Sequence, residues 1–303
     1  MSQRFSYGGQ AVIEGVMMRG RHSLAIAVRR SDGVVLHEEN LTPWAQRYPF
    51  LGWPIVRGSV ALIEAMVMGI RSLSFSANQF AEEEETELTT KEMVLTIGVA
   101  FLLTVGLFIA LPAYVLRFVQ AGIKSNVLLN IVEGLIKIGF FLLYIIGISF
   151  MEDIRRVFEY HGAEHKTINC YEAGEPLVVE NVAKYTTVHR RCGTNFMLIV
   201  FFTSVFVFSF FGRPPFVQRV LLHLALLPLV AGLSYELVRL AGRPNPPLWV
   251  EILAAPGLLL QKLTTREPDG QQIEVAIEAL QTVLRKDETM IPAIGGVQGQ
   301  PVH

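Results

Sequence analysis

Charged residues are scarce in this chain. Asp, Glu, Lys and Arg make up 17% of the 303 residues and hydrophobic residues make up 51%, which gives a mean hydropathy of +0.41. Soluble domains contain about a quarter charged residues. The composition therefore predicts an integral membrane protein with sizeable soluble segments rather than an ordinary soluble domain.

An excess of either sign of charge is also missing. The chain has 26 Lys and Arg against 27 Asp and Glu, a formal net charge of -1. Without a basic surface field, nothing in the composition favours nucleic acid as a partner, and we expect none.

Cysteines are few as well, and a signal peptide is not predicted. Only Cys170 and Cys192 are present, which excludes a disulfide framework and predicts reduced thiols. Residues 1–20 contain no continuous apolar core run of the signal-peptide kind and no small-residue cleavage site, so a signal peptide is not expected.

Residues 1–42 predict a small β-sheet of about three strands. The apolar runs are Gln10–Met18, Ser23–Val28 and Val34–Leu36. A hairpin turn is predicted between the last two, because Gly33 supplies the positive φ that tight turns need. Glu14 interrupts the first run, either on the solvent face of the strand or facing a functional cleft.

Four apolar runs predict transmembrane helices, since a span needs about 20 apolar residues. They are Val94–Leu116, Val127–Phe150, Phe196–Phe211 and Phe216–Leu240. The last two are joined by a tight turn; a helical hairpin buried in a soluble protein is the alternative for that pair. The fold class is thus a mainly α, polytopic helical membrane protein with about four transmembrane helices, a small N-terminal β-sheet and cytosolic helical segments.

Less apolar segments flank these runs. Residues 55–76 predict an amphipathic helix on the membrane surface or on other helices; whether it crosses the bilayer stays open. The chain divides into a β subdomain (1–42), an interfacial aromatic segment with this helix and an acidic linker (43–93), transmembrane helices (94–150), a cytosolic segment (151–195), a transmembrane hairpin (196–240), and an interfacial segment, amphipathic helix and flexible tail (241–303).

Basic residues predict the topology. Nine Lys or Arg precede the first apolar run and six lie between the second and third, whereas the opposite loops hold Arg117, Lys124 and Arg213. By the positive-inside rule both termini and residues 151–195 are cytosolic.

The clearest chemical pattern is His-x-x-Glu-His at His161, Glu164 and His165. On a helix these positions share one face. Two imidazoles four residues apart can hold one divalent ion, and the carboxylate can act as general base on a metal-bound water, as in the inverted zincin motif. The alternative is a polar helix face on which Glu164 pairs with Lys166 or Arg190.

A third metal ligand is needed to leave one position open for water. A second polar cluster, residues 188–194, offers His189 as the first choice and Cys192 as the second. Glu236 is the third choice, because a carboxylate inside an apolar helix invites a functional interpretation, although pairing with Arg239 or Arg219 explains it equally well. The predicted cofactor is a divalent metal, with zinc the best match.

Four stretches together resemble the bacterial YqhQ-like family. They are Gly8–Gly20, His161–Asn169, His189–Thr194 and Thr264–Pro268. The family is described as predicted metal-dependent membrane enzymes of unknown function. The resemblance covers nearly the whole chain and implies a multi-pass protein of the bacterial cytoplasmic membrane.

Three functions remain open at this point. The first is a metal-dependent enzyme, a hydrolase, at the cytosolic face of the membrane, acting on an unknown and membrane-associated substrate. The second is a non-enzymatic scaffold with a structural metal clip. The third, a transport role for charged groups within the apolar helices, rests on Glu133, Lys137, His223 and Glu236.

Overall fold

The computed structural model describes residues 7–83, 89–212, 214–243 and 246–295. The predicted acidic linker and the flexible tail fall largely on residues outside these ranges. The helices are α1 Trp44–Arg47, α2 Val56–Glu83, α3 Thr90–Val105, α4 Leu111–Val119, α5 Asn126–Ile148, α6 Glu152–Ala173, α7 Val179–Val182, α8 Gly193–Phe208, α9 Phe216–Ala241, α10 Leu248–Thr264 and α11 Gly270–Gly295. A π-helical turn, Gly106–Ala110, joins α3 to α4.

The N-terminal sheet has four antiparallel strands in chain order, β1 Gly8–Val12, β2 Gly15–Arg19, β3 Ser23–Arg30 and β4 Gly33–Asn40. The predicted three-strand sheet is wrong at the first run, which is two strands joined at Ile13 and Glu14. Val12 pairs with Gly15, and Glu14 takes a positive φ of 48° in the turn. Both faces of β2 are buried, so the sequence shows no alternation to mark the break.

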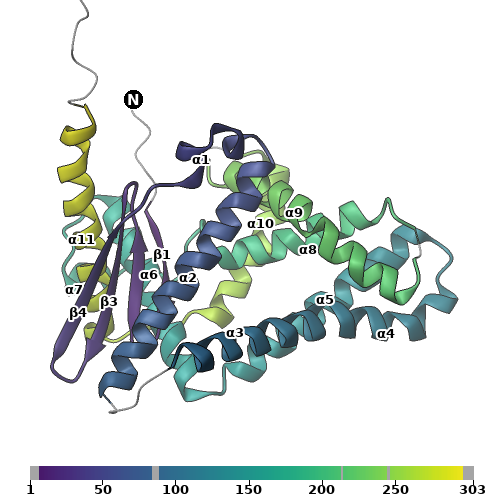
Figure 1. The fold of residues 1–303 in the computed structure, drawn as a ribbon, viewed down its shortest axis with the longest axis horizontal. Helices are drawn as coiled ribbons and strands as arrows, with labels where there is room; N and C mark the ends of the chain where they lie inside the picture. The colour runs from purple at the N-terminus through teal and green to yellow at the C-terminus, as the bar shows by residue number, and fades with distance from the viewer. Residues whose placement is uncertain (1–6, 84–88, 213, 244–245, 296–303) are drawn as a thin grey trace, which may run out of the picture.

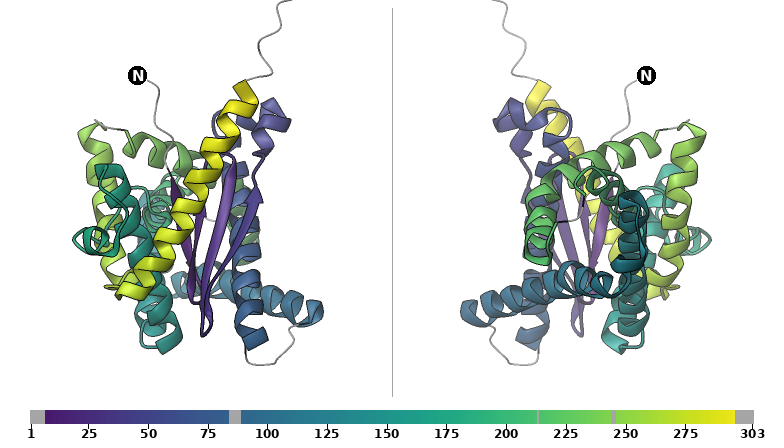
Figure 2. Two further views of the ribbon diagram at one scale, coloured as in Figure 1. Left: turned by 90° about the vertical axis from the view of Figure 1, so that its left-hand side faces the viewer. Right: turned by 90° about the vertical axis from the view of Figure 1, so that its right-hand side faces the viewer.

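Helices cover both faces of the sheet (Figures 1 and 2). On one face, Val16 and Met18 pack with Tyr160 of α6 and Leu280 of α11. On the other, Met17, Leu24 and Ile26 pack against Met68 and Phe75 of α2. We call the sheet with α6 and α11 the polar body. It joins segments from the start, middle and end of the chain.

The last helix forms as its sequence predicts. Asp269 accepts a hydrogen bond from the Gln272 backbone N–H at 2.8 Å, and the Gln272 side chain accepts one from the Asp269 N–H at 2.9 Å. This reciprocal cap satisfies two donors that would otherwise be unpaired at a helix start. The apolar face of α11, with Ile273, Ala276 and Leu280, lies in the core against the sheet.

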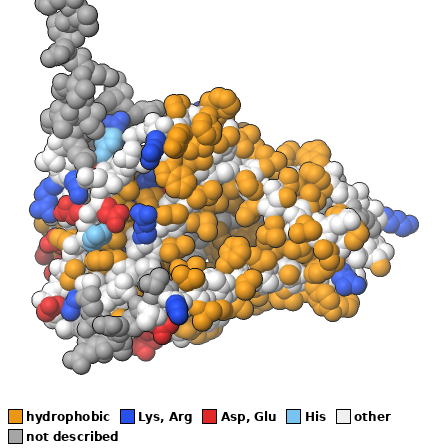
Figure 3. Space-filling view, in the orientation of Figure 1, with side chains coloured by type: hydrophobic (Ala, Val, Ile, Leu, Met, Phe, Trp, Pro, Cys, Tyr) orange, Lys and Arg blue, Asp and Glu red, His pale blue; other side chains and the backbone are white. Residues whose placement is uncertain are grey.

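The remaining long helices form an apolar bundle. Four helical stretches among the described residues are long and apolar enough to cross a membrane: Val56–Ala81, Val94–Gly122, Leu128–Ile148 and Phe216–Ala241. This differs from the expected set of four, because α8 has only 16 residues whereas α2 has 28. Hydrophobic side chains cover the part of the surface over the bundle, and charged ones gather over the polar body (Figure 3).

Candidate metal centre

The His-x-x-Glu-His stretch lies on a helix, as its spacing predicts. Helix α6 begins at Glu152 after a break that follows α5, carries Glu152 and Asp153 in its first turn, and ends at Gly174 with a φ of 80°. Acidic residues favour a helix N-terminus, and glycine adopts this left-handed conformation without strain. The stretch, buried except for the half-buried His161, lies where α6 meets the residue 187–192 loop and the end of α10.

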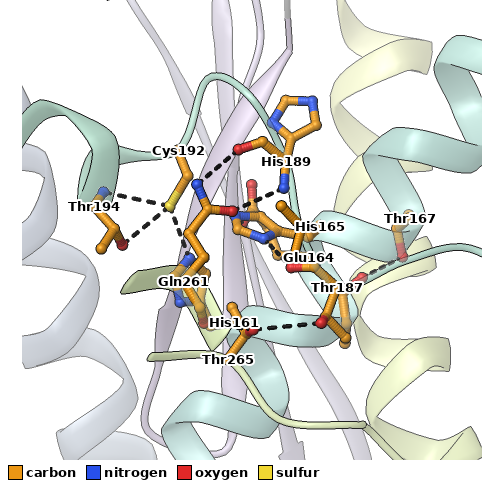
Figure 4. Close-up of polar contacts among 12 residues, drawn as sticks. His161, Glu164, His165, Thr167, Thr187, His189, Cys192, Thr194, Gln261 and Thr265 are labelled. Carbon is orange, nitrogen blue, oxygen red and sulfur yellow. Dashed lines mark hydrogen bonds and ion pairs between the residues drawn. The ribbon is translucent and has the colours of Figure 1, made fainter. Parts of the chain in front are cut away.

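Two of these histidines meet one cysteine. His161, His165 and Cys192 each offer a ligand atom, and the three atoms lie within 4.8 Å of one another. The Nε2 atom of His161 is 3.2 Å from the Cys192 Sγ atom, and the two imidazole centroids are 4.4 Å apart. Figure 4 shows the side chains converging from α6 and from the start of α8. We call these three residues the triad.

Backbone carbonyls fix both imidazoles. The Nδ1 atom of His161 lies 2.8 Å from the Thr264 carbonyl oxygen, and that of His165 lies 2.5 Å from the Thr187 carbonyl oxygen. A carbonyl only accepts, so each Nδ1 carries a hydrogen, and Nε2 is the ring nitrogen that remains to face the triad. Histidines that bind metals are held by this kind of second hydrogen bond.

Cys192 stands at the N-terminus of α8. Its sulfur accepts hydrogen bonds from the Thr194 backbone N–H at 3.4 Å and lies 3.3 Å from the Thr194 hydroxyl. A helix N-terminus favours negative charge, and the thiolate is the form of cysteine that binds metal. Two imidazole nitrogens and a thiolate form a donor set that suits zinc and leaves a fourth position open.

Glu164 lies beside the triad without being part of it. Its Oε2 atom is 3.5 Å from the His165 Nε2 atom, and the residue is 4% exposed. The alternative pairing with Lys166 is not seen, because Lys166 pairs with Glu267 at 2.8 Å. No lysine or arginine among the described residues forms an ion pair with Glu164. A buried carboxylate is costly unless a cation balances it, and a divalent ion on the triad would supply that charge.

His189, the first choice for the third ligand, faces away from the triad. Its Nε2 atom lies 3.5 Å from the Glu172 carboxylate, while Cys192 takes the place beside His161. Hydrogen bonds from His189, and then from Arg191, hold the pKa of Glu172 below its usual range despite partial burial. His189 is buried, with its ring centroid 5.6 Å from that of His165, and it ties the loop that carries Cys192 to Glu172 of α6.

The remaining candidates lie elsewhere. Glu236 forms two hydrogen bonds with Arg57 of α2, at 2.6 and 2.5 Å, rather than with Arg239 or Arg219. Glu14 pairs with Arg156 through both carboxylate oxygens and accepts a hydrogen bond from the Tyr160 hydroxyl at 3.3 Å. Both carboxylates join elements of the fold, and neither reaches the triad.

Sequence patterns missed the groups that hold the site together. Gln261 is fully buried; it accepts from the His189 N–H at 2.8 Å and donates to the His189 carbonyl at 2.9 Å. The one sequence feature that could have pointed to Gln261 is that it is an uncharged polar residue within an apolar run. Thr187 and Thr264 act through backbone carbonyls, for which no side-chain pattern exists.

Comparison with known proteins places the chain in a family. The model of a family described as "Protein of unknown function (DUF1385)" matches residues 53–286. The chain is 36% identical over 300 residues to "Uncharacterized protein YqhQ" of Bacillus subtilis (strain 168), covering 92% of each chain. No solved structure matches. The chain therefore belongs to the DUF1385 family of proteins of unknown function, and it is similar to YqhQ over nearly its whole length.

Proposed function

We propose that this protein is a metal-dependent hydrolase whose centre lies at the cytosolic surface of a bacterial membrane. One observation carries the proposal: three donor atoms meet within 4.8 Å beside a buried carboxylate that has no lysine or arginine ion-pair partner among the described residues. His161, His165 and Cys192 would hold a divalent ion, and zinc fits this donor set. Bound there, the ion would make water acidic enough to attack at neutral pH and would polarise the substrate.

Glu164 has the role of general base in this proposal. The proton of the attacking water passes to its carboxylate, which then delivers it to the leaving group. Burial on α6 keeps the carboxylate close to the His165 Nε2 atom, 3.5 Å away, and excludes competing water. Hydrogen bonds from the two imidazoles to Thr264 and Thr187 keep both Nε2 atoms directed toward the same point.

Membrane insertion is proposed from the four apolar stretches and the polar body. Strands β1–β4, helix α6 and helix α11 pack into one unit, so the segments that carry them lie on one side of the membrane. Two crossings by α3–α4 and α5 satisfy that condition, and so do two by α9 and α8, although α8, with 16 residues, is shorter than the four stretches. The second half of α2 packs on the sheet through Met68 and Phe75, which favours a surface position for that half. Basic residues favour the cytosolic side for the unit.

Metal analysis of detergent-purified wild type and three variants tests the centre. Wild type and His189→Ala are expected to retain about one equivalent of zinc, because three ligands hold the ion. His161→Ala and Cys192→Ala are expected to lose it. Equal metal content in all four proteins, or no metal in wild type purified without chelators, contradicts the assignment.

A structural metal clip is the second candidate, because the triad ties α6 to the start of α8 in a largely buried site. Glu164→Gln separates the two functions. We expect this variant to keep its metal and its fold while losing hydrolysis of p-nitrophenyl ester and phosphodiester reporters that wild type cleaves. A clip predicts no hydrolysis by wild type and unchanged metal content in the variant.

A further inference from the structure

The N-terminal sheet has an edge beside the candidate metal centre. Strand β1 is this edge, because the strands follow one another in chain order, and it lies on the side of the sheet toward the apolar bundle (Figure 1). The Glu164 side chain packs on β1 at Gly9, where its Cγ atom lies 3.2 Å from the place that a Cβ atom would take. The proposed general base is therefore next to the edge strand.

The pairing of β1 with β2 determines which backbone groups of β1 face outward. Val12 pairs with Gly15 across a two-residue turn, and the pair that closes such a turn is a hydrogen-bonded pair. Hydrogen-bonded and non-hydrogen-bonded pairs alternate along an antiparallel ladder. The N–H and C=O groups of Gly9 and Ala11 therefore point away from β2.

Ile13 continues this alternation, and its outward N–H has a partner. It donates to the Ser76 hydroxyl of α2 at 3.3 Å. Among the residues that the structure describes, none forms a hydrogen bond with the outward groups of Gly9 or Ala11. Gly9 is exposed and Ala11 is half-buried. Two donors and two acceptors thus stay open beside Glu164, and we call the outward groups of Gly9 and Ala11 the open edge.

The open edge is complementary to an extended peptide. N–H and C=O groups along an edge pair with the backbone of an added strand, and glycine lets that backbone approach closely. Folded proteins usually protect such an edge with charged side chains or proline. Strand β4, the opposite edge, carries Glu38 and Glu39, whereas β1 contains neither a charged residue nor proline. The sequence of β1 thus favours strand addition.

We propose, on the basis of the hydrolase function above, that the substrate is a peptide that binds in extended form as a fifth strand on the open edge. Hydrolysis adds the oxygen of water to the carbonyl carbon of one peptide bond and breaks its C–N bond. The proton taken up by Glu164 passes to the leaving nitrogen, so the products are a carboxylate and an amine. Backbone pairing selects the extended conformation and leaves the substrate side chains free to vary.

Hydrogen–deuterium exchange tests peptide binding without relying on activity. The probe is acetyl-Val-Thr-Val-Ala hydroxamate, which joins a strand-forming peptide to a zinc-binding group. The matched probe carries methyl groups on its amide nitrogens and cannot donate to a strand. At ten times its dissociation constant, the first probe is expected to slow exchange of the Gly9 and Ala11 N–H groups about tenfold, and the methylated probe is expected to leave it unchanged. The outward N–H of Leu36 on β4 is the internal control and is expected to keep its rate.

A proline substitution tests the open edge from the side of the protein. Ala11→Pro removes one outward N–H without breaking a hydrogen bond to β2, and proline is tolerated at such edge positions. We expect this variant to retain zinc and to cleave quenched-fluorescent casein, an unfolded substrate with many sequences, about tenfold more slowly than wild type. Leu36→Pro makes the same change on β4 and is expected to cleave casein as wild type does. Equal rates in the two variants contradict a role for β1, and the methylated probe decides the matter if Ala11→Pro does not fold.

Two results of the exchange experiment would overturn the proposal. Unchanged exchange at Gly9 and Ala11, with acetohydroxamate binding as tightly as the peptide probe, would leave the metal centre in place and remove the peptide. Protection that needs no probe and rises with protein concentration would assign the open edge to a second copy of the chain. Absence of zinc from wild type would instead contradict the hydrolase function itself, and the peptide substrate with it.

Discussion

The His161 Nε2 atom lies 3.2 Å from the Cys192 Sγ atom, across 31 positions of sequence. His161 belongs to α6 of the polar body, whereas Cys192 begins α8 of the apolar bundle. A metal ion held between them would therefore link the two parts of the molecule. The same contact would place the reacting centre at the level where the chain enters the proposed membrane.

Alkylation of the two cysteines tests this relationship directly. In metal-loaded protein, iodoacetamide is expected to modify Cys192 slowly, because coordination removes the thiolate from reaction. A chelator is expected to accelerate the reaction. Cys170 is the internal control: it is buried, burial raises the pKa of its thiol, and its slow reaction should not respond to chelator. Peptide mass spectrometry measures both, and a Cys192 rate that ignores chelator contradicts metal binding.

Gly162→Ala is expected to disturb the triad through the segments that hold its imidazoles. A Cβ atom at Gly162 would lie far inside van der Waals contact with the Arg266 carbonyl oxygen. The segment that follows α10 must then move, and with it the Thr264 carbonyl that accepts from His161. Overpacking of this kind costs about 1–3 kcal/mol, and we expect weaker zinc binding in competition with a chromophoric chelator.

Gly139→Ala is the control for that substitution. Gly139 lies within α5, and nothing stands within 4 Å of where its Cβ would be. Alanine favours a helix over glycine by up to about 1 kcal/mol, so this variant is expected to match or exceed wild type in stability. Equal zinc affinity in the two variants would show that the close contact at Gly162 does not support the site.

Helical spacing predicted two of the three triad residues. His161 and His165 are four residues apart on a confirmed helix, so they share a face whatever else the chain does. The third ligand was a choice between His189 and Cys192, which are three residues apart in one loop. That choice depends on how the loop turns, and Gln261, 72 residues away, holds it through two hydrogen bonds with the His189 backbone. The sequence pattern around residues 189–192 cannot reveal a contact with a residue so distant in the chain.

Burial explains the misjudged elements of the fold. Because α2 and α6 cover both faces of the sheet, β1 and β2 merged into one apolar run that concealed the turn at Glu14. Helix α2 faces the sheet at one end and α9 at the other, where Gly58 and Gly232 approach closely. These contacts require charged and small residues in α2, and such residues lower the hydropathy from which a membrane-spanning helix is predicted. By contrast, the amphipathic helix predicted within residues 241–303 depends on neighbouring residues, and α11 confirms it.

Gln261→Ala is expected to weaken both stability and metal binding. The substitution leaves the buried N–H of His189 without its partner, at about 1–3 kcal/mol for an unsatisfied group, and leaves the His189 carbonyl with only the 3.5 Å hydrogen bond from the Cys192 N–H. The loop that carries Cys192 loses its support, and such outer partners typically change metal affinity by about 10–100-fold. Chemical unfolding and zinc titration measure the two effects. Gln271→Ala removes an exposed amide on α11 and is expected to leave both unchanged.

Acid is expected to loosen the same loop through Glu172. Hydrogen bonds from His189 and Arg191 lower its pKa in the folded protein, so the carboxylate contributes stability above its unfolded pKa of about 4.3. That contribution is lost as pH falls through the lower folded value. Since the side chain is 38% exposed, we expect less than about 1 kcal/mol. Unfolding is measured against pH with chelator present throughout, so that metal release does not contribute.

Glu172→Gln should remove this part of the acid dependence and leave a flatter stability profile below about pH 4.3. Glu180→Gln is the matched control, because Glu180 is exposed on the next short helix and forms no ion pair with the described residues. Its profile should follow wild type. If the two variants give the same profile, the interaction of Glu172 with His189 and Arg191 does not stabilise the loop. The orientation of Cys192 would then depend on Gln261 and the α8 N-terminus alone.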